Sequence, residues 1–182
     1  MESFPILSLM IALPLLAALA CLFVRADGAR WIALGTTLAL LALGIVLWAN
    51  YVPGGPQWQF VENIPLGPPY LSWALGIDGI ALMLIMLSVF LMPICIGASW
   101  RSIDRRVPEY MAAFLLMEAL MLGVFMAQDL LLFYIFFEAG LIPMYLIIGI
   151  WGGAEKIKAA YKFFLYTLLG SVLMLVAMLV MI

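Results

Sequence analysis

The stretch LLLFYIFFEAGLIPMYLIIGIW, residues 130–151, carries one charged side chain, Glu138, in twenty-two positions. A run of about 20 residues that is almost wholly apolar has the length and composition of a helix that crosses a bilayer. An acidic side chain in the middle of such a helix is costly and needs an explanation. The stretch therefore predicts a membrane-spanning helix that contains a buried carboxyl group.

The composition of the whole chain extends this prediction. Apolar residues make up 68% of the 182 residues and charged residues only 10%, more apolar surface than a soluble domain of this size could bury. Short breaks separate six apolar segments, at 5–24, 31–51, 79–99, 109–127, 130–151 and 160–182. Each has about the 20 residues that a helix needs to span a bilayer. We therefore expect an all-α integral membrane protein, a single membrane domain with six transmembrane helices.

The connections between the segments alternate in charge. All eight basic residues lie in or next to alternate connections: Arg25, Arg30, Arg101, Arg105, Arg106, Lys156, Lys158 and Lys162. The positive-inside rule places these connections on the cytoplasmic or matrix side, with the amino terminus outside. The outer connection at 52–78 holds five prolines and four glycines, so it cannot be helical throughout. Its QWQFVENI core, residues 57–64, could form a short strand over the helix ends.

Ligands for redox groups are scarce in the chain. It has no histidine, and its two cysteines, Cys21 and Cys95, lie inside apolar segments without a CxxC pattern. Both are explained as small buried side chains. We expect no cofactor, no metal site and no electron transfer within this chain. The composition indicates the lipid bilayer as a partner, and we expect no nucleic-acid partner.

Two carboxyl groups fall inside apolar segments. Glu118 lies ten residues before Gln128 and Glu138 ten residues after it, so both are expected about 15 Å below an outer turn. An ionised carboxylate at the centre of a bilayer costs at least about 2.5–3.5 kcal/mol. Such groups either mark a path for protons or ions, or stay neutral and hydrogen bond between helices for packing alone. Spacing does not tell whether the two face one another.

Three further charged residues have local interpretations. Lys162 lies at the start of the last apolar segment, where it could be an internal cation or could extend its amine to the interface. Asp78 and Asp129 come directly before apolar segments, at positions where an aspartate typically caps the first turn of a helix. We therefore expect both aspartates to be N-caps at the outer surface.

Three motifs resemble a known family. FFEAGLIPMYLIIGIWGG at 136–153, AAYKFFLYTLLGS at 159–171 and LGIDGIALML at 75–84 are similar to the antiporter-like membrane subunits of respiratory complex I. The resemblance implies a subunit of about fourteen helices built from inverted repeats, of which this chain would form the first part. It also implies a membrane-arm subunit of the bacterial inner or mitochondrial inner membrane, with the flavin and iron–sulfur clusters in partner subunits. Glu138 matches the family's fifth-helix glutamate, whose partner would be a lysine on a broken seventh helix beyond residue 182.

Three functions follow as hypotheses. The first is proton translocation in NADH–quinone oxidoreductase, in which the chain couples a remote redox reaction to proton movement through buried Glu and Lys side chains. The second is a multisubunit cation/proton antiporter or a hydrogenase membrane subunit, which share the same motifs. The third is a passive membrane scaffold in which Glu118 and Glu138 only pack helices.

Overall fold

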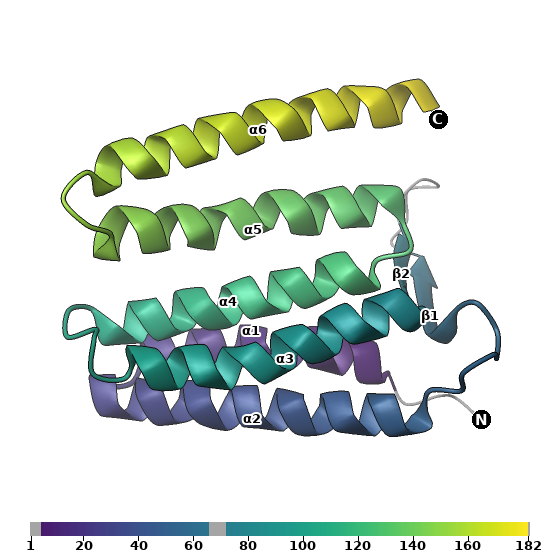
Figure 1. Cartoon of the computed structure of the whole chain (residues 1–182), viewed down its shortest axis with the longest axis horizontal. Coiled ribbons are helices and arrows are strands. Elements are labelled where there is room, and N and C mark those ends of the chain that lie inside the picture. Colours follow the sequence, from purple (N-terminus) through teal and green to yellow (C-terminus); the bar gives the residue numbers. More distant parts are fainter. Residues whose placement is uncertain (1–4, 66–71, 182) are drawn as a thin grey trace.

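The computed structural model describes residues 5–65 and 72–181, which form helices and one two-stranded sheet. The helices are α1 (Ile6–Leu22), α2 (Ala26–Asn50), α3 (Gly79–Ser99), α4 (Val107–Met126), α5 (Leu130–Trp151) and α6 (Lys156–Met181). The strands are β1 (Gln59–Pro65) and β2 (Ser72–Ile77). The helices run roughly along one direction, with the sheet at one end of the molecule and short connections at the other (Figure 1).

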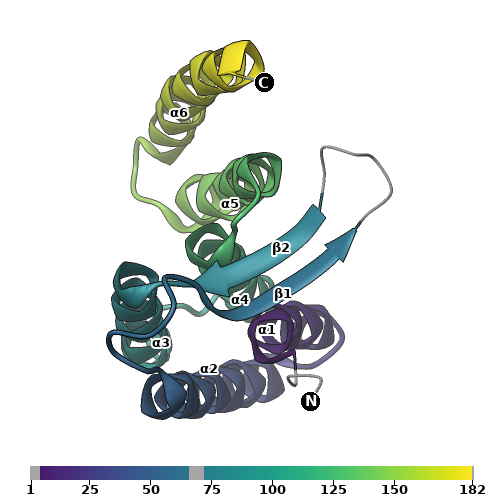
Figure 2. The same ribbon diagram turned by 90° about the vertical axis from the view of Figure 1, so that its right-hand side faces the viewer.

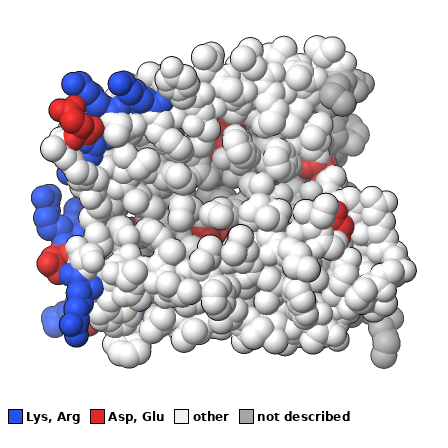
Figure 3. Space-filling model, in the orientation of Figure 1, with Lys and Arg blue, Asp and Glu red and all other residues white. Residues whose placement is uncertain are grey.

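The two ends of the molecule differ in charge. We call the end with β1 and β2 the hairpin end, and the end with connections 23–25, 100–106 and 152–155 the basic end. Lys and Arg side chains gather at the basic end, and the middle of the visible face is almost wholly uncharged (Figure 3). The alternate connections that carry the basic residues therefore lie together at one end of the helices.

The helices follow the predicted segments closely. Among the described residues, α2 to α6 are each long and apolar enough to cross a membrane, and α1 is a shorter apolar helix of 17 residues. Helices α3 and α5 coincide with the predicted segments at 79–99 and 130–151. The predicted starts at 31, 109 and 160 are too late, because α2, α4 and α6 begin at Ala26, Val107 and Lys156. Charged residues can occupy the first turn of a helix that begins in the headgroup region, so the helix can be longer than its apolar segment.

Helix α4 is at the centre of the arrangement. It packs against α1, α2, α3 and α5, and these contacts make α1–α4 a four-helix bundle (Figure 2). Helix α5 lies on the outside of that bundle and α6 lies on α5, which is its only neighbour among the elements that the structure describes. Helix α4 therefore has neighbours on most sides, while α5 and α6 form a layer beside the bundle.

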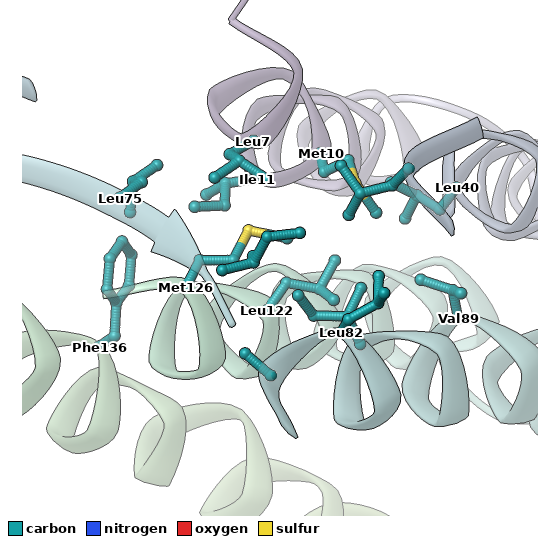
Figure 4. Packing of buried hydrophobic residues seen from close by; sticks show 14 of the residues in the cluster. Leu7, Met10, Ile11, Leu40, Leu75, Leu82, Val89, Leu122, Met126 and Phe136 are labelled. Carbon is teal, nitrogen blue, oxygen red and sulfur yellow. The ribbon is translucent and has the colours of Figure 1, made fainter. Parts of the chain in front are cut away.

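The interior of the bundle has two apolar clusters along its length. The hairpin-end cluster draws on all four helices, and Figure 4 shows part of it; its members include Leu7, Met10, Ile11, Leu40, Leu82, Ile85, Val89, Leu122 and Met126. The basic-end cluster contains Ala18, Cys21, Ala29, Ala33, Ile96, Val107, Tyr110, Met111, Ala112 and Leu115. Leu116 on α4 packs against both clusters and joins them.

The outer connection adds one two-stranded sheet to the predicted helical fold. Strand β1 confirms the predicted strand, but β2 was not predicted, and the two strands pair antiparallel with Glu62 opposite Leu75 and Ile64 opposite Trp73. The sequence SWALGI, residues 72–77, is apolar and lies within the predicted connection at 52–78. Pairing with β1 gives the backbone N–H and C=O groups of β2 hydrogen-bond partners before α3 begins. Residues 66–71 of the connection lie outside the described residues.

The hairpin caps α1 from a distance. Pro5 precedes α1 and supplies no side-chain cap. The carboxylate of Glu62 on β1 instead accepts hydrogen bonds from the backbone N–H groups of Leu7 at 2.8 Å and Ser8 at 3.1 Å, and Trp73 donates its indole N–H to the Ser8 hydroxyl at 2.9 Å. Because a carboxylate at a helix N-terminus stabilises the unpaired N–H groups there, β1 holds the start of α1 in place.

The same hairpin is held to α5. Asp129 accepts hydrogen bonds from the N–H groups of Leu131 at 2.8 Å and Leu132 at 3.1 Å, and from the N–H and hydroxyl groups of Ser72, both at 3.1 Å. Burial alone would raise the pKa of Asp129, but these four hydrogen bonds together hold the pKa below its ordinary value. Asp78 accepts a bond of 2.7 Å in the first turn of α3, so both predicted N-caps are confirmed.

Candidate functional site

Glu138 lies on α5, eight residues after the helix begins at Leu130. Its side chain is half-buried, and its Oε1 atom is buried without a hydrogen-bond partner within residues 5–65 and 72–181. A buried acceptor without a partner costs about 1–3 kcal/mol, and more when it is charged. The carboxyl group therefore has an unfilled hydrogen-bonding position that a proton, a water or a cation could occupy.

Tyr134 lies beside this carboxyl group and Ser171 lies beside Tyr134; sequence reasoning missed both. Tyr134 lies one helical turn before Glu138, and its hydroxyl lies near the Glu138 carboxyl group and near the hydroxyl of Ser171 on α6. Ser171 is 3% exposed and donates a hydrogen bond to the Leu168 carbonyl at 2.9 Å. The sequence signal for this pair is the i, i+4 spacing of Tyr134 and Glu138, which makes the two side chains neighbours on one face of a helix. The Glu138 site thus lies between α5 and α6.

Glu118 is enclosed more completely than Glu138. It is 1% exposed, and neither of its carboxyl oxygens has a hydrogen-bond partner in the described part of the chain. It lies eight residues before α4 ends at Met126, and Glu138 lies eight residues after Leu130, so the predicted equal depth agrees with the helix bounds. At 1.5 Å per residue, both are about 12 Å from the α4–α5 turn.

The contact between α4 and α5 shows that the two carboxyl groups point apart. Gly123 faces the ring of Phe136 so closely that an added Cβ would lie 2.7 Å from it. At 100° per residue, Glu118 is about 140° around α4 from Gly123, and Glu138 is about 160° around α5 from Phe136. Glu118 therefore points into the α1–α4 bundle and Glu138 points toward α6, which answers the question that spacing left open.

The structure does not bring Lys162 to Glu138. The rings of Tyr145 and Phe164 lie 5.5 Å apart and set the register between α5 and α6. With this register Lys162 is about nine residues, or about 13 Å, nearer the basic end than Glu138. The Lys162 side chain is exposed, and the ion pairs within the described residues are Arg30–Asp27, Arg106–Glu109 and Lys158–Glu155. A role of Lys162 as an internal cation stays a prediction.

Metal ligands do not converge in the described part of the chain, where no three His, Cys, Asp or Glu side chains are grouped to hold an ion. Cys21 is buried in the basic-end cluster and Cys95 is half-buried on α3. The candidate site therefore consists of carboxyl and hydroxyl groups. Such groups can bind and release protons or hold water, and at this depth they are surrounded by apolar side chains.

Comparison with known families adds two matches. Residues 6–128 match the family described as NADH-ubiquinone oxidoreductase chain 4, amino terminus. Residues 127–182 match the transmembrane family described as NADH:quinone oxidoreductase/Mrp antiporter. The first match covers α1–α4 with the hairpin, and the second covers α5 and α6 with Glu138.

Individual relatives agree with these matches. The chain is 52% identical to NADH-quinone oxidoreductase subunit M of Rhodobacter capsulatus, over 97% of this chain and 35% of that protein. It is 46% identical to NADH-ubiquinone oxidoreductase chain 4 of Arabidopsis thaliana, over 95% of this chain and 36% of that protein. With subunit M of Rickettsia conorii it is 38% identical, over 98% of this chain and 38% of the relative. The chain thus spans little more than a third of the length of these relatives.

Proposed function

The chain belongs to the family of NADH-quinone oxidoreductase subunit M and NADH-ubiquinone oxidoreductase chain 4 proteins, and from this premise we propose that it is part of a proton-translocating subunit in the membrane arm of complex I. The oxidation of NADH and the reduction of quinone belong to partner subunits, which hold the flavin and the iron–sulfur clusters. The whole subunit has about fourteen helices, and its partners are the other membrane-arm subunits, the lipid bilayer and protons.

The observation that carries this proposal is the environment of Glu138. Its Oε1 atom has no partner among the described residues, although it is buried at mid-depth in an apolar helix. An acidic group at such a depth is expensive, and such groups commonly lie on proton or ion pathways. The hydroxyl group of Tyr134 beside it, which also lies near the hydroxyl of Ser171, can accept or donate a hydrogen bond as the carboxyl group gains or loses a proton.

In the proposed mechanism Glu138 holds a proton, or pairs with a lysine on the helix that the family resemblance places beyond residue 182. A distant redox event changes this pairing and moves the proton onward, which makes the chain one part of an allosteric coupling. Moving one charge against 100 mV takes about 2.3 kcal/mol. A change in the partner of a buried carboxylate can supply that amount, because unpairing a buried charge costs several kcal/mol.

The orientation of the chain is part of the same proposal. The basic end lies on the cytoplasmic side of a bacterial inner membrane, or on the matrix side of a mitochondrial one, and the amino terminus and the hairpin end lie outside. The gathering of Lys and Arg at one end of the helices supports this orientation through the positive-inside rule. Protons then move from the basic end toward the hairpin end.

Replacement of Glu138 by glutamine tests the proposal. In the assembled complex, Glu138→Gln keeps the size and the hydrogen-bonding groups of the side chain but cannot exchange a proton. We expect assembly to be retained, with severe loss of proton pumping and of the coupled NADH–quinone activity. Glu155→Gln, at the exposed basic end, is the matched control and keeps both activities. Normal pumping by an assembled Glu138→Gln complex would instead support the passive scaffold.

A second candidate function is a subunit of a multisubunit cation/proton antiporter. The family description for residues 127–182 includes Mrp antiporters, and these residues contain Glu138. Purification distinguishes the two: complex I predicts that quinone-reducing peripheral subunits accompany the chain. Rescue of growth under sodium stress, without such partners, would favour the antiporter.

A further inference from the structure

Helices α5 and α6 contact each other along one face of each helix. The rings of Tyr145 and Phe164 lie 5.5 Å apart, and a Cβ added at Gly149 would lie 3.7 Å from the Cβ of Ala160. Both contacts fit one antiparallel register, because Tyr145 lies four residues before Gly149 and Phe164 lies four residues after Ala160. The register therefore identifies which residue of α6 lies at the level of a given residue of α5.

Ser171 is the residue of α6 at the level of Glu138. It lies seven residues after Phe164, and Glu138 lies seven residues before Tyr145, which is about two helical turns in each case and returns to the same face. Ser171 is 3% exposed, and among the side chains that the structure describes on α6 it is the only buried polar one. A hydroxyl group is therefore enclosed against α5 at the depth of the Glu138 carboxyl group.

The hydroxyl group of Tyr134 lies near both of these groups. Tyr134 is four residues before Glu138 on α5, so the two side chains share a helix face. The Glu138 Oε1 atom is buried and has no hydrogen-bond partner within the described ranges 5–65 and 72–181. The carboxyl group, the phenol and the Ser171 hydroxyl therefore form a row of three polar groups that runs from α5 to α6.

The hydrogen bond that Ser171 already makes decides its role in this row. Its hydroxyl donates to the Leu168 carbonyl of its own helix at 2.9 Å. A serine hydroxyl has one proton and two acceptor lone pairs, so toward Tyr134 it is an acceptor. The phenol of Tyr134 also has one proton, which it can donate either to Ser171 or to Glu138.

The two protonation states of Glu138 use the row in opposite directions. An ionised carboxylate only accepts hydrogen bonds, so Tyr134 donates to it, and this bond is a strong one because the acceptor is charged. A neutral carboxyl group donates to the phenol oxygen instead, and Tyr134 then donates to Ser171. The O–H bond of Tyr134 turns and does not break, so both states of Glu138 have a hydrogen-bond partner.

Other charged groups lie farther from Glu138 than this row. Lys162 on α6 is exposed and about 13 Å nearer the basic end, and Asp129 lies about 13 Å nearer the hairpin end, bonded to the first turn of α5. Glu118 on α4 points into the bundle, and β2 has no titratable side chain. The remaining titratable side chains of α4, α5 and α6 lie toward the basic end from Glu138: Glu109, Tyr110, Tyr145, Lys156, Lys158, Tyr161 and Tyr166.

We propose that Tyr134 and Ser171 are positioning residues for Glu138, in which the phenol of Tyr134 donates to the carboxylate in one protonation state and to Ser171 in the other. Because this acceptor belongs to α6, a shift of α6 away from α5 removes a partner in the neutral state only and so favours the ionised carboxylate. The purpose of the arrangement rests on the proton-carrying role proposed for Glu138, but the hydrogen bonds themselves do not.

Infrared difference spectroscopy of the assembled complex, with the full-length subunit, tests this proposal. Acid-minus-alkaline spectra, recorded without NADH, are compared with those of Glu138→Gln to assign the bands of the neutral and ionised carboxyl group. Tyr134→Phe removes the donor to the charged form, so the ratio of the neutral to the ionised band at a fixed pH is expected to rise about fivefold. Ser171→Ala weakens only the neutral form, so this ratio is expected to fall about fivefold.

Two matched controls remove a hydroxyl group elsewhere on the same helices. Tyr145→Phe retains the ring contact with Phe164 and lies about 10 Å along α5 from Glu138. Thr167→Val removes a hydroxyl that donates to the Phe163 carbonyl of its own helix at 2.8 Å. Both controls are expected to leave the band ratio unchanged.

Opposite shifts in Tyr134→Phe and Ser171→Ala are the specific signature, because a general loss of packing would move both ratios in the same direction. Equal ratios in wild type and both variants, or shifts of the same sign, would overturn the proposal. If Tyr134→Phe fails to assemble, an unchanged ratio in Ser171→Ala overturns it alone. The spectra are recorded without turnover, so normal pumping by Glu138→Gln would remove the pumping role and leave the hydrogen-bond result to be judged separately.

Discussion

Glu118 and Glu138 lie at the same depth in two neighbouring antiparallel helices, and their side chains point to opposite sides of the α4–α5 contact. Two carboxyl groups at equal depth would interact strongly if they faced each other. The contact between Gly123 and Phe136 prevents this, because it turns both acidic residues away from the helix interface. The chain therefore holds two separate acidic sites, one inside the bundle and one between α5 and α6.

Independence of the two sites is the first prediction. Glu118→Gln and Glu138→Gln should have additive effects on the thermal stability of the assembled complex, because neither side chain shares a partner with the other. Separate sites usually add within about 0.3–0.5 kcal/mol. The measurement is a double-mutant cycle, and an interaction energy well above 0.5 kcal/mol would contradict the opposed orientation.

The close approach at Gly123 gives a second prediction. In Gly123→Ala the new Cβ would lie 2.7 Å from the Phe136 ring, which also packs against Trp73 at 5.7 Å, so the helices must separate. We expect a loss of about 1–3 kcal/mol in unfolding free energy. Gly140→Ala is the control: nothing lies within 4 Å of its added Cβ, so the variant should be neutral or slightly stabilising. Unfolding of the full-length subunit in detergent compares the two.

The cap that Glu62 supplies to α1 gives a third prediction. Glu62→Ala removes an acceptor from the N–H groups of Leu7 and Ser8, and we expect a loss of about 1 kcal/mol, typical of a lost helix cap. Faster hydrogen exchange should be confined to the first turn of α1. Glu62→Gln retains a carbonyl acceptor and should lose less stability. Equal losses in the two variants would show that the carboxyl oxygens do not cap α1.

The pKa of Asp129 gives a fourth prediction, on pH. Because the folded protein holds this pKa below the ordinary value of 3.8, the ionised form stabilises the native state. This contribution is fully present above the ordinary pKa, and is lost as the pH falls from there through the lower pKa of the folded protein. Asp129→Asn keeps a side chain that caps helices well but does not titrate.

The stability of Asp129→Asn, measured by unfolding in detergent as a function of pH, should therefore fall less than that of wild type over this acidic range. Near neutral pH, where Asp129 does not titrate, the stabilities of the two proteins should differ by a constant amount. Parallel pH curves for the two proteins would show that the bonds from Ser72 and the first turn of α5 do not depend on the charge of Asp129.

Much of the fold was predictable because it depends on local composition. The lengths of the apolar segments placed α3 and α5, and the aspartates before them identified the caps. A strand in the outer connection was expected within residues 57–64, but its partner was not. Strand β2 has an apolar sequence that suits several structures, and only pairing with β1 selects one.

The sequence identified the acidic residues of the candidate site, but it did not identify the residues that lie around them. Glu138 and Glu118 are conspicuous as charges in apolar stretches. Tyr134 and Ser171 are ordinary residues of membrane helices, and become part of a site only where α5 meets α6.

The amino-acid sequence by itself determined that this chain is a set of apolar helices, with the basic residues in alternate connections and two acidic residues at equal depth. These properties follow from hydropathy and from the fixed rise of a helix. Only the tertiary structure decided where the acids point and which residues surround them. The direction of a side chain around its helix depends on which face packs against a neighbour, and here the contact of Gly123 with Phe136 sets that direction.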